Sequence, residues 1–86
     1  MATTFVELDA ITADKVIDAR GAACPGPLLE VKKGMGTVPV GSVIELWSTD
    51  PVTKTDINAW STKVGHEFLG AVAGDGYDRV LVRRGR

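Results

Sequence analysis

The chain has 86 residues, a formal net charge of -1, 44% apolar residues and 24% charged residues. This length holds one domain with one core, and the composition is that of an ordinary globular protein, so a second domain, disorder and a fibrous repeat are excluded. A charge so close to zero provides no overall field that would attract nucleic acid or an anionic membrane.

The N-terminus shows no targeting or membrane signal. The start "MATTFVELDA" lacks a basic segment followed by a long apolar run, and no window reaches the roughly 18 apolar residues of a membrane span. We therefore expect a cytoplasmic protein without membrane contact. Residues 1–14 are an N-terminal extension, in which residues 3–8 either add an edge strand or stay loose.

Two short strands are predicted in the first half of the chain. Residues 15–21, "KVIDARG", read as a strand that ends at a glycine, and Val43–Ser48, "VIELWS", are rich in β-branched and aromatic residues. Trp47 falls on a position that matches core periodicity, so we expect it in the core.

A helix is predicted between these strands. Leu28, Val31 and Met35 recur at positions i, i+3 and i+7, which forms one apolar stripe on a helix. Gly34 and Gly36 are expected to end this helix.

A second helix is predicted after the second strand. Asp50 or Thr53 is expected as its N-cap, with Pro51 in the first turn and a capping box from Thr53 to Asp56. Gly65 is a natural left-handed stop at its C-terminus. The buried stripe is expected to contain Ile57, Trp60 and Val64.

The chain then ends in a β-hairpin, because "HEFLGAVA" and "DRVLVRR" flank the glycine-rich turn "GDGY". The predicted order is β-α-β-α-β-β over a single domain, residues 1–86. Four strands and two amphipathic helices predict an α+β fold, a two-layer sandwich with both helices on one face of a four-stranded mixed sheet.

The single cysteine lies in "CPGP", at the predicted start of the first helix. Pro25 favours extended geometry at Cys24, which suits an N-cap residue, and proline is itself favoured at the first helical position. The unpaired N–H groups and partial positive charge of a helix start favour a thiolate over a thiol. Pro27 removes one donor, so the N–H groups of Gly26 and Leu28 are expected to reach the sulfur.

The ordinary role of a lone cytosolic cysteine is that of a small buried apolar residue. The position of Cys24 between a loop and a helix start, beside two prolines, favours exposure and reactivity instead. One cysteine and one histidine are too few for an internal disulfide or a zinc site, so we expect no metal and no cofactor.

These residues resemble the TusA/SirA-like sulfur carrier proteins. The resemblance comprises "DARG", "CPGP", "VKK", "DPVTKTDINAW" and "GHEF", and it covers roughly residues 16 to 84. It implies that Cys24 accepts a sulfane sulfur as a persulfide and passes it to another protein, without a cofactor. The implied partners are a donor, which is a cysteine desulfurase, a rhodanese or a DsrE-like protein, and an acceptor in tRNA thiolation, cofactor assembly or dissimilatory sulfur oxidation.

Four further residues are weighed beside the cysteine. Arg20 either adds positive charge beside the thiolate or pairs with Asp18 or Asp50 to hold the loop. Lys32 and Lys33 lie about 12 Å along the helix from Cys24, too far to stabilise its charge, so they are either docking charges for a partner or ordinary solvated lysines. His66 is expected to cap the second helix or to lie at the edge of the core.

Two other functions remain open from the sequence. Compact sandwiches of this kind also bind RNA, and the C-terminus "RRGR" is basic, although the net charge argues against direct contact with nucleic acid. The chain could also be a regulatory interaction module in which the cysteine is incidental.

Overall fold

The computed structural model describes residues 13–23 and 26–86. These residues form a strand, a helix, a strand, a helix and two further strands, in the predicted order. The elements are β1 (Lys15–Asp18), α2 (Gly26–Met35), β2 (Val43–Ser48), α3 (Thr53–Val64), β3 (Glu67–Ala73) and β4 (Asp78–Arg83). The predicted α+β fold class is confirmed, whereas the alternatives considered for residues 3–8 lie outside the described residues.

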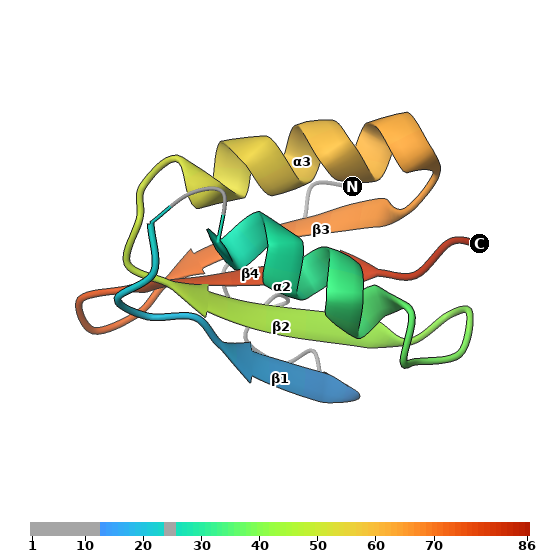
Figure 1. Ribbon diagram of the computed structural model, residues 1–86, viewed down its shortest axis with the longest axis horizontal. Coiled ribbons are helices and arrows are strands. Elements are labelled where there is room, and N and C mark those ends of the chain that lie inside the picture. The colour runs from blue at the N-terminus through green and yellow to red at the C-terminus, as the bar shows by residue number, and fades with distance from the viewer. Residues whose placement is uncertain (1–12, 24–25) are drawn as a thin grey trace.

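The four strands form one mixed sheet in the order β1-β2-β4-β3. β1 is parallel to β2, because α2 crosses over between them, and β4 is antiparallel to both β2 and β3. The carboxyl ends of β1 and β2 and the β3–β4 turn therefore lie at one end of the sheet, on the left of Figure 1. We call this end the site end, and it comprises residues 19–23, 49–52 and 74–77 with the adjoining strand residues 18 and 45–48. The opposite end is the far end, and it comprises residues 36–42, 65–66 and 84–86 with the adjoining helix residues 60–64.

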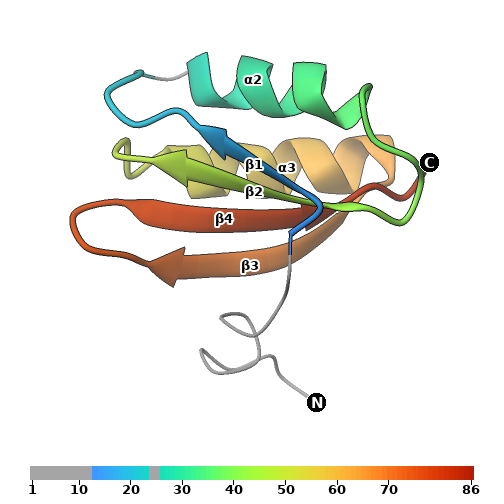
Figure 2. The same ribbon diagram turned by 90° about the horizontal axis from the view of Figure 1, so that it is seen from below.

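Both helices lie on the same side of the sheet, as Figures 1 and 2 show. Alternate residues of β2 and β4 point to this side and form the main core with apolar residues of the helices. The fully or nearly buried members of the main core are Ala19, Val31, Met35, Ile44, Leu46, Ile57, Val80 and Val82. Trp60 and Phe68 are half-buried and pack against them.

Helix α2 continues through Gly34 to Met35, so the prediction that Gly34 ends it is wrong. Gly34 is buried where the helix approaches β1, and a Cβ added there would lie 2.6 Å from Ile17 Cδ1. The glycine therefore permits close packing of α2 on the sheet, and the helix ends before Gly36.

Helix α3 begins differently from the sequence prediction. Pro51 lies in a turn before the helix, in which the Thr53 N–H donates to Asp50 O at 3.2 Å, and Val52 stands at the N-cap without a side-chain cap. Thr53 is buried, and its hydroxyl accepts a hydrogen bond from Ser48 Oγ at 2.8 Å. The predicted Thr53–Asp56 capping box is wrong, because the Thr53 hydroxyl binds the strand instead.

The C-terminus of α3 is as predicted. Gly65 has a left-handed φ of 88°, and the N–H groups of Gly65 and His66 both donate to Ser61 O, at 3.0 and 2.8 Å. This arrangement satisfies a carbonyl that the end of a helix otherwise leaves unpaired.

The side of the sheet away from the helices carries both polar and apolar side chains. Glu45 and Trp47 of β2 point to this side, because the neighbouring Ile44 and Leu46 point to the helices. The prediction that Trp47 belongs to the core is therefore wrong. A small apolar cluster of Val43, Val72 and Leu81 lies on this side as well.

Candidate functional site

The site end is where the chain leaves β1 and leads to the cysteine. Cys24 and Pro25 lie outside the described residues, and so do the predicted N-cap position of Cys24 and the helical position of Pro25. The residues on either side are joined directly, because the Gly26 N–H donates to Ala23 O at 2.8 Å. The loop 19–23 and the first turn of α2 are thus joined by a direct hydrogen bond.

The loop 19–23 is a tight turn with several anchors. The Ala22 N–H donates to Ala19 O at 3.2 Å, and Gly21 takes a φ of 86°, which is the conformation that the third residue of a type II turn requires. The Ala19 N–H donates to Trp47 O at 2.9 Å, and the Gly21 N–H donates to Thr49 Oγ1 at 2.9 Å. Strand β1 therefore ends at Asp18, earlier than predicted, and the turn is bound to the end of β2.

Gly26 and Pro27 form the described beginning of α2. The N–H of Gly26 donates to Ala23 O, and the sulfur that the N–H groups of Gly26 and Leu28 are predicted to reach lies outside the described residues. Pro27 lies in the first turn, where a proline leaves no helical hydrogen bond unmade, and its ring is buried. These two residues fix the direction in which the helix departs from the loop.

Arg20 has two possible carboxylate partners in the sequence, and the structure shows Asp18. Arg20 Nε donates to Asp18 Oδ1 at 2.9 Å and Nη2 donates to Oδ2 at 2.8 Å, while the Arg20 backbone N–H also donates to Oδ1 at 3.1 Å. Hydrogen bonds from the Arg20 side chain and backbone lower the pKa of Asp18 to about 2. Asp50 instead accepts from the Val52 N–H at 2.9 Å.

Sequence reasoning missed three residues of this end, Trp47, Thr49 and Tyr77, the last of which has its ring centre 5.1 Å from the Arg20 guanidinium. The Arg20 guanidinium lies 4.9 Å from the centre of the Trp47 ring, and Thr49 binds the turn. The signal for Trp47 was present: it stands two residues after Glu45, and residues two apart in a strand share a face. Thr49 gave no comparable signal, because its partner is 28 residues away.

Lys32 and Lys33 are exposed in the last turn of α2. Basic residues in this place also interact favourably with the negative end of the helix dipole. The exposure suits either of the predicted roles, a docking charge or a solvated lysine.

His66 lies at the far end, remote from the loop 19–23. Its ring centre is 5.1 Å from that of Trp60, and its Nδ1 accepts from the Gly85 N–H at 3.0 Å. Burial lowers the pKa of His66, and the positive charges of Arg84 and Arg86 lower it further. His66 therefore stays at the edge of the core, one of its two predicted places, and is no part of the site.

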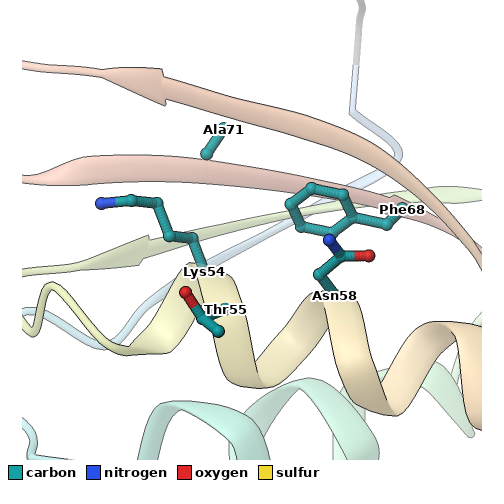
Figure 3. A pocket seen from close by; sticks show the side chains of 5 residues that line it. All are labelled: Lys54, Thr55, Asn58, Phe68 and Ala71. Carbon is teal, nitrogen blue, oxygen red and sulfur yellow. The ribbon is translucent and has the colours of Figure 1, made fainter.

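A hollow of about 270 Å³ lies between α3 and the edge strand β3. Figure 3 shows Lys54, Thr55 and Asn58 of α3 facing Phe68 and Ala71 of β3. Lys54 Nζ is bound to Asp78 Oδ2 at 3.1 Å. The lining residues include no thiol, imidazole or carboxylate, and the amine among them, Lys54 Nζ, is paired with Asp78.

The described residues offer neither a metal-binding cluster nor a helix that could span a membrane. Residues 13–23 and 26–86 contain no group of three or more His, Cys, Asp or Glu side chains placed to hold a metal ion. Neither α2 nor α3 is long and apolar enough to cross a bilayer, and the described part of the chain has no other helix.

Comparison with known proteins relates the chain to sulfur-handling proteins. A family model described as sulfurtransferase TusA matches residues 15–84. A protein from Archaeoglobus fulgidus, whose name marks it provisionally as a sulfur carrier, is 42% identical over 80% of this chain and 94% of its own length. The sulfur carrier protein TusA from Pseudomonas savastanoi is 30% identical over 90% of this chain and 92% of its own length.

The fold also has a counterpart among solved structures. A SirA-like protein from Desulfitobacterium hafniense superposes with a TM-score of 0.74, covering 84% of this chain and 99% of its own length. Its sequence identity is 22%, so this likeness concerns the fold alone.

Proposed function

Because the chain belongs to the TusA family, we propose that it is a sulfur carrier that accepts a sulfane sulfur on Cys24 as a persulfide and passes it to an acceptor protein. The observation that supports this most strongly is the family match over residues 15–84, which contain the single cysteine of the chain. Sulfur carrying is the general role of the family, and we add to it Cys24 as the carrier residue and the persulfide as the form in which it holds the sulfur.

The first step is an exchange at sulfur. The Cys24 thiolate attacks the outer sulfur of a donor persulfide, a new S–S bond forms on Cys24, and the donor's own S–S bond breaks to release a donor thiolate. In the second step, a nucleophile of the acceptor attacks the outer sulfur of the Cys24 persulfide, and Cys24 leaves as a thiolate. Each step exchanges one S–S bond for another or for an acceptor–sulfur bond, so no external oxidant is needed.

Two features of the chain favour this chemistry. Helix α2 begins two residues after Cys24 in the sequence, and the partial positive charge of a helix start stabilises a thiolate. No second cysteine exists in the chain to attack the persulfide and discharge it. The sulfur is therefore retained until an acceptor arrives.

Arg20 is assigned a supporting role in this proposal. Its guanidinium is already neutralised by both oxygens of Asp18, so little of its positive charge remains for a thiolate. We assign it to holding the loop 19–23 in place, and we assign the activation of the thiol to the start of α2.

The donor and acceptor are proteins, in keeping with the family, and we propose that Lys32 and Lys33 attract an acidic surface of the donor. Donors of the desulfurase, rhodanese and DsrE-like classes are all compatible with this surface. Replacing either lysine with glutamate should slow sulfur loading at low salt and flatten its salt dependence. Lys63→Glu is the matched control, because Lys63 is an exposed lysine in the last turn of α3.

The central experiment measures the mass of the intact protein after incubation with a persulfide donor. Wild type should gain about 32 Da, one sulfur atom, which a reductant removes. Cys24→Ser should gain nothing and should transfer nothing to an acceptor, while its circular dichroism spectrum and unfolding midpoint stay unchanged.

Two outcomes would contradict the proposal. A wild-type thiol that takes up no sulfur from a desulfurase, a rhodanese or a small-molecule donor excludes the carrier function. Full biological activity of Cys24→Ser would show an interaction module with an incidental cysteine, and RNA affinity that falls steeply with salt would indicate a nucleic-acid-binding protein.

A further inference from the structure

An aromatic and cationic cluster lies beside the loop 19–23, on the side of the sheet away from the helices. The Arg20 guanidinium carbon is 4.9 Å from the ring centre of Trp47 and 5.1 Å from that of Tyr77. The two rings are themselves in contact, with centres 5.4 Å apart and planes inclined at 45°. Both distances to the cation fall within the range of about 6 Å over which an arginine is attracted to an aromatic face.

The Trp47 ring is held in a fixed orientation by polar contacts behind it. Its Nε1–H donates to Glu45 Oε2 at 2.6 Å, and the same carboxylate receives Arg79 Nε and Nη2, each at 3.2 Å. Glu45 is only 7% exposed, so this network is protected from water and keeps its geometry. The indole therefore offers Arg20 a rigid surface.

The cluster joins three segments that are distant in the sequence. Arg20 comes from the loop after β1, Trp47 from the end of β2, and Tyr77 from the turn before β4. Trp47 also accepts the Ala19 N–H at its backbone carbonyl, so one residue holds the loop 19–23 through both its main chain and its ring.

We propose that Trp47 and Tyr77 are positioning residues for sulfur transfer: they hold Arg20, and through it the loop 19–23 that leads to Cys24. This inference rests on the proposed carrier function. The Asp18–Arg20 pair joins neighbours in the sequence, and the bonds to Trp47 O and Thr49 Oγ1 hold only the main chain of the loop. The two rings add contacts from β2 and from the β3–β4 turn to the Arg20 side chain.

The effect is expected in the local order of the loop more than in the stability of the whole fold. The side chains of Arg20 and Asp18 are 44% and 49% exposed, and contacts at such exposed positions are individually weak. Losing one ring should therefore increase the opening of the loop by about two- to fivefold, the range that an exposed cation–π contact supports.

The experiment compares Trp47→Leu and Tyr77→Leu with Tyr77→Phe, which keeps the ring. Amide exchange of Gly21 and Ala22, followed by NMR, reports the opening of the loop, and the rate of transfer from persulfidated Cys24 to an acceptor reports function. Both leucine variants should show the two- to fivefold faster exchange and a transfer rate reduced by a similar factor. Tyr77→Phe should match wild type in both measurements.

Trp60→Leu is the matched control, because Trp60 also stacks on a neighbouring ring but lies at the far end. It should lower the unfolding midpoint without changing the exchange of Gly21 and Ala22 or the transfer rate. If Trp47→Leu fails to fold, Tyr77→Leu still decides the matter, since Tyr77 is only partly buried and lies in the turn before β4.

Two results would overturn the inference within a working carrier. One is unchanged exchange in Tyr77→Leu, and the other is faster exchange with an unchanged transfer rate. A wild type that takes up no sulfur at all overturns the proposed function and the positioning role together. The two failures are thus distinguished by the behaviour of the wild type.

Discussion

The two ends of the sheet use the same residue types, a tryptophan, a second ring and arginine, for different purposes. At the site end, Arg20 stacks on Trp47 and Tyr77 and is bound by both oxygens of Asp18. The positive charge is largely neutralised there, and the guanidinium serves as a link between a loop and the sheet.

At the far end, Trp60 stacks on His66, and Arg84 Nη1 donates to the peptide carbonyl oxygen of Val38. A peptide carbonyl carries no net charge, so this contact does not neutralise the guanidinium, which disfavours a second cation nearby. Burial lowers the pKa of His66, the charges of Arg84 and Arg86 lower it further, and its Nδ1 accepts a hydrogen bond from the Gly85 N–H. The arginine at the site end thus links a loop to two rings, whereas the arginines at the far end add to the effect of burial on the ionisation of a ring.

The largest expected effect comes from breaking the carboxylate network at the site end. Glu45→Ala removes the partner of Arg79 and of the Trp47 indole, and both groups then lose hydrogen bonds in a poorly solvated place. We expect the free energy of unfolding to fall by about 2 to 3 kcal/mol, measured by urea denaturation.

The matched control is Glu67→Ala. Glu67 pairs with Arg83 at 3.1 Å on the same sheet, but its side chain is 59% exposed, so the change should be within about 0.5 kcal/mol. Equal losses for the two variants would show that Glu45 is no more important than a surface ion pair.

A smaller change in the free energy of unfolding, a gain in place of a loss, is expected at the far end when Ser61 of α3 is replaced. Ser61 is fully buried, and its Oγ has no hydrogen-bond partner within the described part of the chain. Ser61→Ala removes an unsatisfied hydroxyl and should raise the free energy of unfolding by about 1 kcal/mol. Ser48→Ala is the comparison at the site end: its hydroxyl is buried but bonded to Thr53, so the same change should destabilise. Destabilisation by Ser61→Ala would contradict this account of the buried hydroxyl.

His66 at the far end should also make the stability of the fold depend on pH near neutrality. The pKa of His66 is lowered in the fold below its ordinary value of 6.5, so the unfolded chain binds more protons between those two values. Stability should therefore be complete above pH 6.5 and decline as the pH falls through that value. Because the chain has one histidine, His66→Gln should remove this dependence from thermal unfolding curves between about pH 8 and pH 5. A slope that persists in the variant would assign it to another group.

The smallest effect concerns the exposed Asp18–Arg20 pair at the site end. Arg20 lowers the pKa of Asp18 from 3.8 to about 2. The contribution of the Asp18 carboxylate to the stability of the fold is therefore complete above pH 3.8 and is lost as the pH falls toward 2. Asp18→Asn should lie below wild type in thermal stability at neutral pH, and the gap should close at acid pH. A gap that stays constant down to about pH 2 would mean that the carboxylate charge is not responsible.

Much of the fold follows directly from local sequence signals. The described elements follow in the predicted order, and the signals behind that prediction include the β-branched and aromatic residues of "VIELWS", the apolar stripe of α2, the left-handed stop at Gly65 and the glycine-rich hairpin turn. Each signal lies within a few residues of the element that it specifies, because helix and strand periods and the φ of a glycine are local properties. The "CPGP" motif is also a local signal, and it indicated a resemblance to the TusA/SirA-like family.

Tertiary packing decided the rest. Gly34 reads locally as a helix stop, but close contact with β1 makes it an interior helical residue. Thr53 reads as a cap, yet its hydroxyl is engaged by Ser48 of the preceding strand.

The surroundings of the loop 19–23 were also settled by the tertiary structure. Arg20 meets Trp47 and Tyr77, which lie 27 and 57 positions later in the sequence. The sequence determined where the single cysteine stands along the chain and which residue types flank it. Only the pairing of β2 with β1 and β4 determined which rings hold the loop before it, because strand register alone brings such distant side chains together.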